Sequence, residues 1–451
     1  MKIKITNQIQ VTGTPRNLDR EIRKRLTLKN PEYLQAKKMG RYLWNIDEYL
    51  FFFKKDDTGS LFLPRGYARE LFTLCREQGV KPEFVDNRRI LSEVSFSFEG
   101  TLRDYQEDAF DDILKRDFGN LDSAVGSGKT IMCLATIAAR RQPTTVVVHS
   151  KELLFQWRER VTEFLNIPES EIGIIGAGEK TIGTRLTIGI KNSVLNCLDE
   201  ITPRTGFLVV DEAHRAGSKG YCDLIGGFDC QYMLGVSGTP FRSDGLSKVI
   251  RWNLGPVVHK VPQKALVNAG HILNPEIVWR PTRFTTELNP SEEYSRVISE
   301  VVSNSERNKQ IIQDVQEAIN TDGQTCLLLS DRKQHCETLK SLLGADAVVV
   351  IGTTSTKGRK QALDAVREGA AKVLIATNSL IGEGFDMARL SNLFLCSPVK
   401  WRGRTIQMIG RILRPLEGKS AKLYDYVDSG VGVLKAQGKA RLKTYQEQGW
   451  C

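Results

Sequence analysis

The stretch Ser123-Ala-Val-Gly-Ser-Gly-Lys-Thr130 is followed further along the chain by Phe207-Leu-Val-Val-Asp-Glu-Ala-His214. Residues 121–124 are typical of a strand end, and residues 131–140 of a helix. Gly126 and Gly128 let backbone N–H groups approach phosphate oxygens where side chains would block them, and the dipole of the following helix favours an anion. The first stretch therefore predicts a phosphate-binding loop between a strand and a helix.

The side chains of this loop indicate which phosphate compound it holds. Lys129 would reach the β- and γ-phosphates of a nucleoside triphosphate, and the Thr130 hydroxyl would ligate magnesium. Ser123 stands where the generic pattern has its first glycine, so only the second half of the pattern matches. A chance match in a solvated loop is the alternative. The predicted nucleotide-binding set is Ser123, Gly126, Ser127, Gly128, Lys129 and Thr130.

The second stretch supplies acidic residues at the expected place. Phe207-Leu-Val-Val is a short apolar run typical of a buried parallel strand, and it leads directly into Asp211 and Glu212. Open α/β sheets bind their ligands at the carboxyl ends of such strands. Asp211 would hold Mg²⁺ through water, and Glu212 would polarise the attacking water. An ordinary charged turn is the alternative, and the upstream loop argues against it. Together the two stretches predict ATP hydrolysis with Mg²⁺.

Composition limits the class of protein. The chain has 451 residues, enough for about two or three domains, and its 41% hydrophobic and 26% charged residues are typical of a globular protein. The nine cysteines form no C-x-x-C pair, which indicates reduced thiols in a cytoplasmic protein. We expect no membrane span, because no apolar run is long enough, and no signal peptide in Met1-Lys-Ile-Lys-Ile-Thr.

Positive charge gathers near the N-terminus. The formal net charge is +11, and residues 1–98 carry 19 Lys and Arg against 12 Asp and Glu, a surplus of 7. A basic surplus suits a polyanion, so we expect these residues to form a separate module that contacts nucleic acid. Its four clustered aromatic residues would stack on bases or, more in line with usual burial, form the core of the module: Trp44, Phe51, Phe52 and Phe53.

Local patterns predict the elements of this module and of the rest of the chain. Residues 42–64 predict a β-hairpin with a polar tip at 54–60, and residues 19–28 and 68–78 predict helices. From residue 99 onward, strands alternate with helices, which indicates parallel α/β sheets. The predicted strands lie at 144–149, 186–190, 207–211, 232–237, 325–330, 347–351, 372–376, 392–397 and 422–427. The predicted domains are 1–98, 99–255 and 256–435, with a basic tail at 436–451 that frays, and residues 242–304 contain the connection and an inserted element.

Four further motifs accompany the two stretches: Leu102-Arg-Asp-Tyr-Gln106, Ser237-Gly-Thr-Pro-Phe-Arg242, Ala376-Thr-Asn-Ser-Leu-Ile-Gly-Glu-Gly-Phe-Asp386 and Gln407-Met-Ile-Gly-Arg-Ile-Leu-Arg-Pro415. In this order the six resemble the motifs of superfamily 2 helicases of the DExH branch, over roughly residues 100–430. The chain looks most similar to XPB-type and UvsW-type DNA remodelling helicases, which include phage branch-migration helicases. The resemblance implies two tandem RecA-like parallel-sheet domains with a small α+β N-terminal domain.

The resemblance also implies roles for residues. Gln106, with Arg103 nearby, would read the adenine edge, while Gly384 and Asp386 would line the ribose and the domain cleft. Arg411 and Arg414 would be arginine fingers, with Gln407 near the attacking water. By themselves these two arginines would be ordinary solvated charges on a helix. Ser237 and Thr239 would couple the ATP site to the grip on nucleic acid.

Backbone phosphates would be held by Ser150, Lys151 and Gln156 in the first domain and by Ser330, Arg332 and Thr377 in the second. Lys151 and Gln156 would otherwise continue an amphipathic helix, and Trp157 is expected in the core. Isolated histidines such as His149 and His214 are more often structural than catalytic.

The implied activity is ATP-dependent unwinding or branch migration of forked and Holliday-type DNA in replication, recombination or repair. The implied protein is a monomeric motor without membrane contact, in the cytoplasm of a host cell if a phage encodes it. Two alternatives stay open. One is an RNA helicase, and the other is a nucleic-acid clamp or a restriction-complex subunit with a regulatory ATP site. The intact Lys129, Glu212 and Arg411 argue against a motor that has lost its activity, and no nuclease constellation is visible.

Overall fold

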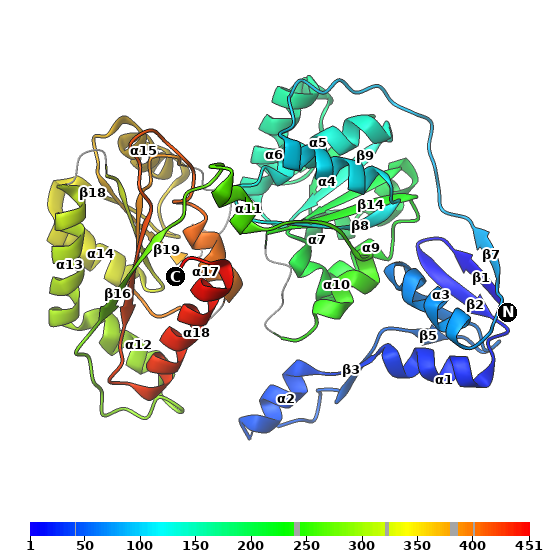
Figure 1. The fold of residues 1–451 in the computed structure, drawn as a ribbon, viewed down its shortest axis with the longest axis horizontal. Coiled ribbons are helices and arrows are strands. Elements are labelled where there is room, and N and C mark those ends of the chain that lie inside the picture. Colours follow the sequence, from blue (N-terminus) through cyan, green and yellow to red (C-terminus); the bar gives the residue numbers. More distant parts are fainter. Residues whose placement is uncertain (41, 239–243, 321–323, 379–386, 400–401) are drawn as a thin grey trace. The chain divides into compact units, whose positions relative to one another are not determined.

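A computed structural model divides the chain into two compact units (Figure 1). The structure describes residues 1–40, 42–238, 244–320, 324–378, 387–399 and 402–451, without the side chains of residues 356, 402–404 and 407. Unit 1 comprises Met1–Ser123 and Gly128–Val261, and unit 2 comprises Ala124–Ser127 and Pro262–Cys451. Among the described residues, no helix is both long and apolar enough to cross a lipid bilayer.

Unit 1 is built around an eight-stranded sheet. Its strands are β8 (Phe118–Ser123), β9 (Thr144–Val148), β10 (Gly173–Gly176), β11 (Glu179–Lys180), β12 (Leu186–Ile190), β13 (Phe207–Asp211), β14 (Tyr232–Ser237) and β15 (Val257–Val261). They lie in the order β11-β10-β12-β9-β13-β14-β8-β15, and every pair is parallel except β10 and β11. Strands β9 and β13 are buried along their whole length, as their β-branched and apolar residues predict.

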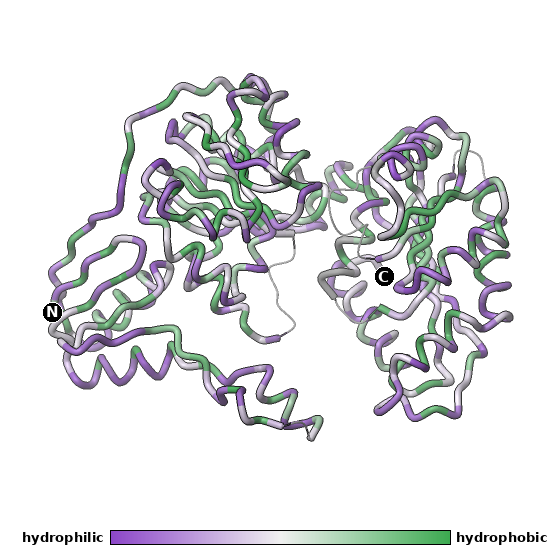
Figure 2. Tube along the Cα trace, turned by 180° about the vertical axis from the view of Figure 1, so that it is seen from behind, coloured by the Kyte–Doolittle hydropathy of each residue, from purple (hydrophilic) through white to green (hydrophobic). Residues whose placement is uncertain are grey.

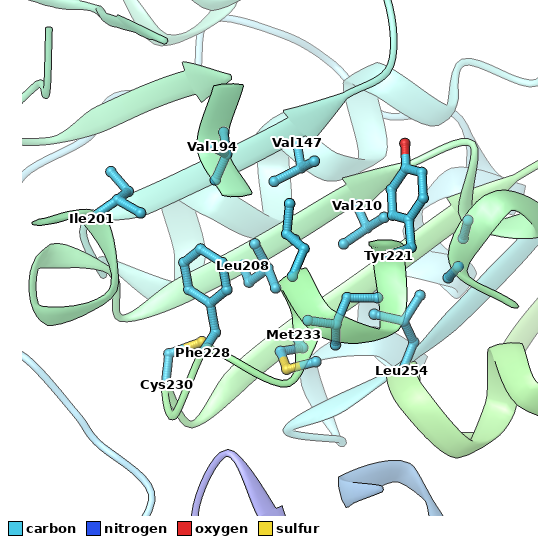
Figure 3. Close-up of a cluster of buried hydrophobic side chains, with 14 of the residues drawn as sticks. Val147, Val194, Ile201, Leu208, Val210, Tyr221, Phe228, Cys230, Met233 and Leu254 are labelled. Carbon is cyan, nitrogen blue, oxygen red and sulfur yellow. The ribbon is translucent and has the colours of Figure 1, made fainter. Parts of the chain in front are cut away.

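Helices connect these strands and cover the sheet (Figure 1). They are α4 (Asp104–Leu114), α5 (Lys129–Arg140), α6 (Lys151–Leu165), α7 (Lys191–Leu195), α8 (Leu198–Ile201), α9 (Lys219–Ile225), α10 (Ser247–Leu254) and the 3₁₀ turn η4 (Ala213–Gly217). Side chains of the strands meet those of the helices in one buried cluster that includes Val147, Leu208, Phe228, Met233 and Leu254 (Figure 3). Along the chain, hydrophobic residues follow the strands and hydrophilic residues the outer helices (Figure 2).

Unit 2 contains a six-stranded sheet whose pairs are all parallel. The strands are β16 (Glu276–Pro281), β17 (Cys326–Ser330), β18 (Ala347–Val350), β19 (Val373–Thr377), β20 (Asn392–Leu395) and β21 (Lys422–Val427). Their order is β16-β21-β20-β17-β19-β18. The helices are α11 (Gln263–Asn268), α12 (Tyr294–Ser303), α13 (Ser305–Ile319), α14 (Lys333–Leu343), α15 (Thr356–Glu368), α17 (Arg402–Ile409) and α18 (Gly432–Gln448). The predicted pair of parallel-sheet domains is confirmed.

The C-terminal residues do not form the frayed tail that their polar composition predicts. They belong to α18, which ends at Gln448. Arg441 donates hydrogen bonds to both carboxylate oxygens of Asp425 on β21, at 2.7 and 2.8 Å, and the Tyr445 hydroxyl donates to the same carboxylate at 2.7 Å. All three side chains are buried. A buried ion pair therefore fixes the helix to the sheet.

The N-terminal module is an α+β fold with its own five-stranded sheet. The strands are β1 (Lys2–Ile5), β2 (Gln8–Thr12), β5 (Lys54–Lys55), β6 (Leu61–Pro64) and β7 (Glu83–Asp86), in the order β5-β6-β2-β1-β7, and its helices are α1 (Arg16–Arg25) and α3 (Ala68–Glu77). A second excursion contains β3 (Thr27–Lys29), α2 (Pro31–Lys38) and β4 (Tyr49–Phe51). The predicted hairpin is thus shorter than expected: only β5 and β6 form it, while β4 pairs with β3.

The module shares a hydrophobic core with the first parallel-sheet domain. Leu246, Val249 and Trp252 near and within α10 belong to the same buried cluster as the module's own apolar residues. The Phe52 ring lies 5.3 Å from the Trp252 ring, measured between centroids. Backbones also meet closely at Gly66, where a Cβ atom would lie 2.2 Å from the Arg251 carbonyl oxygen. The module is therefore packed against α10 and is no free appendage.

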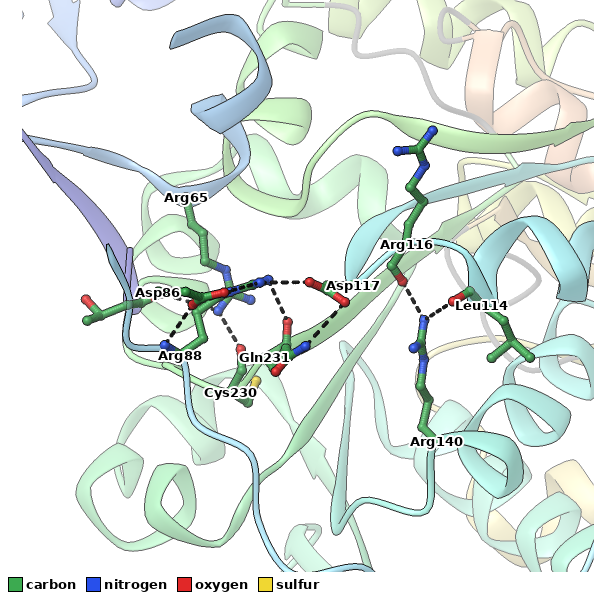
Figure 4. A network of polar contacts seen from close by, with 10 residues as sticks. Arg65, Asp86, Arg88, Leu114, Arg116, Asp117, Arg140, Cys230 and Gln231 are labelled. Carbon is green, nitrogen blue, oxygen red and sulfur yellow. Dashed lines mark hydrogen bonds and ion pairs between the residues drawn. The ribbon is translucent and has the colours of Figure 1, made fainter. Parts of the chain in front are cut away.

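Arginines reinforce this contact (Figure 4). Arg65 is buried and donates to the Cys230 carbonyl oxygen at 2.6 Å. Arg88 pairs with Asp86 of the module at 2.6 Å and with Asp117 of the sheet domain at 2.7 Å. Burial lowers the pKa of Arg65 to about 10, so it stays charged at neutral pH. Because the Arg88 guanidinium pairs with a carboxylate of the module and with one of the sheet domain, it helps to fix the orientation of the module.

Two predicted boundaries need correction. The first sheet continues past residue 255, because β15 pairs with β8. Residues 244–304 hold no single inserted element: α10 and β15 belong to unit 1, and α11, β16 and α12 to unit 2.

Candidate active site

The phosphate-binding loop leaves the sheet at the carboxyl end of β8 and enters α5 at Lys129. Gly126 and Gly128 have φ angles of 87° and 79°, in the left-handed region that glycine adopts without strain. Ser123 and Ser127 are buried within the loop. The first turn of α5 leaves N–H groups without partners inside the helix, as an anion-binding helix start does. The local backbone is therefore that of the predicted loop.

Gln106 lies directly against this loop. A Cβ atom at Gly128 would lie 2.5 Å from Gln106 Nε2, so only glycine fits there. The Gln106 side chain is buried, and its Oε1 accepts the N–H of Arg103 at 3.0 Å at the start of α4. The Arg103 side chain is exposed. The structure thus brings Gln106 to the loop, and its contact with adenine stays a prediction.

The two acidic residues sit at the end of β13, one strand away from β14 and two from β8. Asp211 is buried, and its Oδ2 accepts a hydrogen bond from Trp157 Nε1 at 2.9 Å. Its Oδ1 accepts the N–H of Glu212 at 2.8 Å. Burial, and then the neighbouring charge of Glu212, raises the pKa of Asp211, while Trp157 and Lys129 act in the opposite direction. A buried carboxylate held only by neutral donors is a suitable ligand for a cation.

Glu212 is connected to the next motif by a histidine. The backbone of Glu212 is left-handed, with φ 50°, which is costly for a non-glycine residue. His214 Nδ1 lies 3.2 Å from Glu212 Oε2 and 3.2 Å from Ser237 Oγ at the end of β14. Burial opposes the charge of Glu212, but its hydrogen bond with His214 and the charge of Lys129 outweigh burial and lower its pKa. Glu212 is therefore an anion poised beside Lys129.

These residues fit a nucleoside triphosphate with Mg²⁺. The glycines open the loop for phosphate, and Lys129 acts electrostatically on both Asp211 and Glu212. Thr130, in the first turn of α5, and Asp211 offer the oxygen ligands that Mg²⁺ prefers. Among the described residues, no cluster of three or more His, Cys, Asp or Glu side chains forms another metal site.

The predicted nucleic-acid contacts of unit 1 lie at the start of α6. Ser150 caps this helix, because its Oγ accepts the N–H of Leu153 at 3.3 Å. Lys151 is exposed and Gln156 is half-buried on the same helix. Their phosphate contacts stay predictions. Trp157 is buried, as expected of a core residue.

The predicted contacts of unit 2 include one correction. Ser330 is 0% exposed, and its Oγ lies 2.9 Å from His335 Nδ1, whose other ring nitrogen lies 3.0 Å from Asn308 Oδ1. This hydroxyl belongs to an internal hydrogen-bond network, which differs from the exposed position expected of a phosphate contact. Arg332 is half-buried and donates to Ser295, and Thr377 is buried at the end of β19.

The arginines of the last motif follow α17. Arg411 is half-buried and Arg414 is exposed. Lys419 Nζ donates to the carbonyl oxygen of Arg414 at 2.8 Å and to that of Ala388 at 2.7 Å. It therefore connects the end of the 407–415 motif to the segment that follows the 376–386 motif. Burial, with the charge of Arg414, lowers the pKa of Lys419 to about 8. Thr239, Gly384 and Asp386 lie outside the described residues, as does the side chain of Gln407.

Sequence reasoning did not assign three functional contacts. The Trp157–Asp211 bond joins residues 54 positions apart, and no local pattern signals it. His214 was expected to be structural, and it bridges Glu212 and Ser237. Lys419 lies beyond the recognised motif, where only its position after Arg414 could have drawn attention.

Comparisons with known proteins agree with this geometry. Residues 99–242 match the family model "Type III restriction enzyme, res subunit", and residues 308–415 match "Helicase conserved C-terminal domain". An Acanthamoeba polyphaga mimivirus protein assigned as an ATP-dependent RNA helicase is 25% identical over 78% of this chain and 69% of its own length. The DNA 3'-5' translocase XPB2 of Sulfurisphaera tokodaii is 23% identical over 75% of this chain and 84% of its own.

Among solved structures, T4 UvsW aligns with 99% of this chain and 98% of its own, at 17% identity and a TM-score of 0.45. Both family models fall on the parallel-sheet domains, and between them they contain the phosphate-binding loop, the acidic pair and the paired arginines. The two family models and the XPB-type and viral relatives support a superfamily 2 helicase related to the XPB type, as the motif order predicts.

Proposed function

We propose that this helicase couples ATP hydrolysis to movement on DNA and that it unwinds or branch-migrates forked DNA. The observation that carries the ATP part is the loop from β8 into α5, with Gly126 and Gly128 in the left-handed region, together with the buried Asp211 at the end of β13 and Glu212 directly after it. Lys129 would bind the β- and γ-phosphates, and Glu212 would orient the attacking water. Bound Mg²⁺, held by Thr130 and Asp211, would neutralise charge on the phosphate oxygens.

The chain offers a route from hydrolysis to movement. Loss of the γ-phosphate changes the surroundings of Glu212, and His214 links that residue to Ser237 at the end of β14. Arg411 and Arg414 would enter from the second domain and stabilise charge on the transferred phosphoryl group, a contribution of about 10³ to 10⁵ in rate. Such residues must come from a part that moves, which two domains joined by one connection provide.

Two features favour DNA as the track. XPB2 is named a DNA translocase, and the basic surplus of residues 1–98 suits an extended polyanion. The mimivirus relative, assigned to RNA, supports RNA helicase activity as the second candidate. The restriction-subunit name of the first family model supports a motor within a larger complex. Forks, Holliday-type junctions and roles in replication, recombination or repair belong to the proposal only.

The test compares ATP hydrolysis with forked DNA, plain duplex, single-stranded DNA and RNA. We expect the strongest stimulation by forked DNA, and stimulation by RNA alone would reject DNA as the track. Lys129→Ala and Glu212→Gln are expected to abolish hydrolysis and strand separation while DNA binding persists. Lys180→Ala is the control, since Lys180 is exposed and forms an ion pair with Glu200. A Lys129→Ala protein that still unwinds DNA would overturn the site.

A further inference from the structure

The excursion formed by β3, α2 and β4, residues 27–51 and called the arm below, exposes an unusual share of hydrophobic side chains. Of the 14 large hydrophobic residues that the described chain exposes, six lie here: Leu34, Met39, Tyr42, Trp44, Tyr49 and Phe51. Tyr42 is 95% exposed, Trp44 91% and Phe51 64%. Single exposed apolar residues need no explanation, but a concentration of them on one element indicates a binding surface.

Hydrogen bonds nevertheless fix the described residues of the arm at its base. Asn30 Oδ1 accepts the N–H of Glu32 and so caps α2, while Asn30 Nδ2 donates to the Asp47 carbonyl oxygen at 2.8 Å. The Asn30 N–H donates to the Glu48 carbonyl oxygen at 2.9 Å. One residue thus ties the start of the helix to the chain that leads into β4.

The two strands of the arm have one face inward and one outward. Their register pairs Thr27 with Phe51, Leu28 with Leu50, and Lys29 with Tyr49. Leu28 and Leu50 pack against the core of the module. Because side chains alternate along a strand, Tyr49 and Phe51 share the opposite face with Thr27 and Lys29. The outward face therefore carries two aromatic rings beside an ammonium group.

This aromatic face continues into a groove within unit 1. The groove has a volume of about 390 Å³, and its wall includes Phe51, Phe53, Phe62, Lys54 and Arg65 together with the edge of α9. The Phe51 and Phe53 rings meet edge to face with centroids 5.9 Å apart. One acidic residue, Asp223, also lines the groove. Lys29 lies opposite Tyr49 in the strand pair, and Lys54 follows Phe53, while the exposed Asp47 and Glu48 lie between Trp44 and Tyr49 in the chain.

We propose that the arm binds single-stranded nucleic acid by stacking unpaired bases on Tyr42, Trp44 and Phe51. This assignment rests on the proposed function, because it takes a polynucleotide as the track of the motor. Exposed flat rings offer stacking surfaces to unpaired bases, and Lys29 and Lys54 near Tyr49 and Phe51 offer positive charge to the phosphates. A duplex hides its base faces and cannot stack in this way. The basic surplus of the module points the same way.

The test measures binding of the full-length protein to a dye-labelled oligothymidylate and to a blunt duplex by fluorescence anisotropy. Trp44→Ala and Phe51→Ala are each expected to weaken binding of the single strand about tenfold, since stacking on one ring typically contributes that much, and to leave duplex binding unchanged. Phe84→Ala is the matched control, because Phe84 is 47% exposed on β7 of the same module. It should bind like the unmodified protein.

The salt dependence separates stacking from charge. The tenfold ratio should be the same at low and high salt, because only phosphate contacts release counterions. The proposal would be overturned if the double variant Trp44→Ala, Phe51→Ala bound the single strand as tightly as the Phe84→Ala control. It would also be overturned if the double variant lost as much affinity for the duplex as for the single strand. The result stands apart from the proposed function: if Lys129→Ala keeps full ATPase activity, the active site is wrong, while loss of strand binding in Trp44→Ala still supports the arm.

Discussion

Replacing Trp157 by phenylalanine should impair ATP hydrolysis although Trp157 touches no substrate in the proposed mechanism. The indole N–H donates to Asp211 Oδ2 at 2.9 Å, and the side chain is buried. Phenylalanine keeps an aromatic ring in the core but removes that donor. Asp211 is the proposed Mg²⁺ ligand, so the substitution should act on metal binding first.

The structure sets the size and the pH direction of this effect. A hydrogen bond to a charged group contributes about 1.5–3 kcal/mol, which corresponds to roughly a tenfold to hundredfold change in apparent Mg²⁺ affinity. Burial already raises the pKa of Asp211, and Trp157 counteracts that rise. Without the donor the pKa rises further, so the carboxylate is protonated at higher pH. The acidic limb of the ATPase profile should therefore move to higher pH.

The assay is steady-state ATP hydrolysis over a range of Mg²⁺ concentrations and pH values. Trp252→Phe is the matched control, because it removes the same atoms from another buried tryptophan, in α10. Both variants should lose some stability to denaturant through the lost volume. If Trp157→Phe shows the same Mg²⁺ dependence and the same pH profile as Trp252→Phe, then Trp157 only packs and the reasoning is wrong.

Three predictions concern stability. Arg441→Ala leaves the Asp425 carboxylate buried without its partner and should cost about 3–5 kcal/mol in the free energy of unfolding, measured by urea denaturation; a loss within error would show that the pair is not closed in solution. Deleting residues 1–98 uncovers Trp252, so we expect a lower melting temperature together with reduced ATPase activity; a truncated protein that melts like the full chain would contradict the shared core. Burial lowers the pKa of His335 to about 3 from the ordinary value near 6.5, so the folded state holds the neutral ring, and its stabilising effect is present above about pH 6.5 and declines as pH falls toward 3. His335→Gln should flatten this decline in urea titrations at pH 7.5 and 5, and an unchanged slope would exclude His335 as the cause.

The interior of the fold followed from the sequence because interior parallel strands are short apolar runs. Strands β12, β13, β14 and β21 have the same bounds in the structure as in the prediction. Strands β10, β15 and β16 were missed, although the edge strand β18 was predicted at 347–351. Strand β15 reads Val-Val-His-Lys-Val, and its outward positions are half-exposed or exposed. The helix at the C-terminus was missed for another reason. Its buried face contains Arg441 and Tyr445, and a hydrophobic pattern cannot register a buried charge whose partner, Asp425, lies on a strand.

The site shows the same division between local and long-range information. The glycines and Lys129 act through the backbone of one loop, so their spacing alone predicts their geometry. Ser330 follows its strand just as a phosphate ligand should, yet its hydroxyl is used inside the domain by His335 and Asn308. Whether a side chain is exposed depends on how elements distant in the chain pack together, and a short sequence motif carries no information about that packing. For the same reason the favoured core interpretation of the four aromatic residues is wrong for Trp44 and Phe51, which are exposed, while Phe52 and Phe53 pack against the core of the module.

The acidic pair stands between two elements that reach outward from the sheet. Helix α6 carries Trp157, which holds Asp211, and its first turns carry the residues proposed to grip phosphates. The turn η4 carries His214, which contacts Glu212 and Ser237, and η4 packs against α10, which in turn shares its core with the N-terminal module. A shift of α6 on gripping the strand would change the hydrogen bond to the metal ligand, and a change at Glu212 would reach α10. Packed elements transmit small displacements, so a shift at one end of either element would affect the other. Nucleic-acid stimulation of ATP hydrolysis would then depend on Asp211, which Trp157 of α6 holds, whereas the position of the module is connected to Glu212 through η4 and α10. We therefore expect Trp157→Phe to reduce the stimulation while the module stays in place.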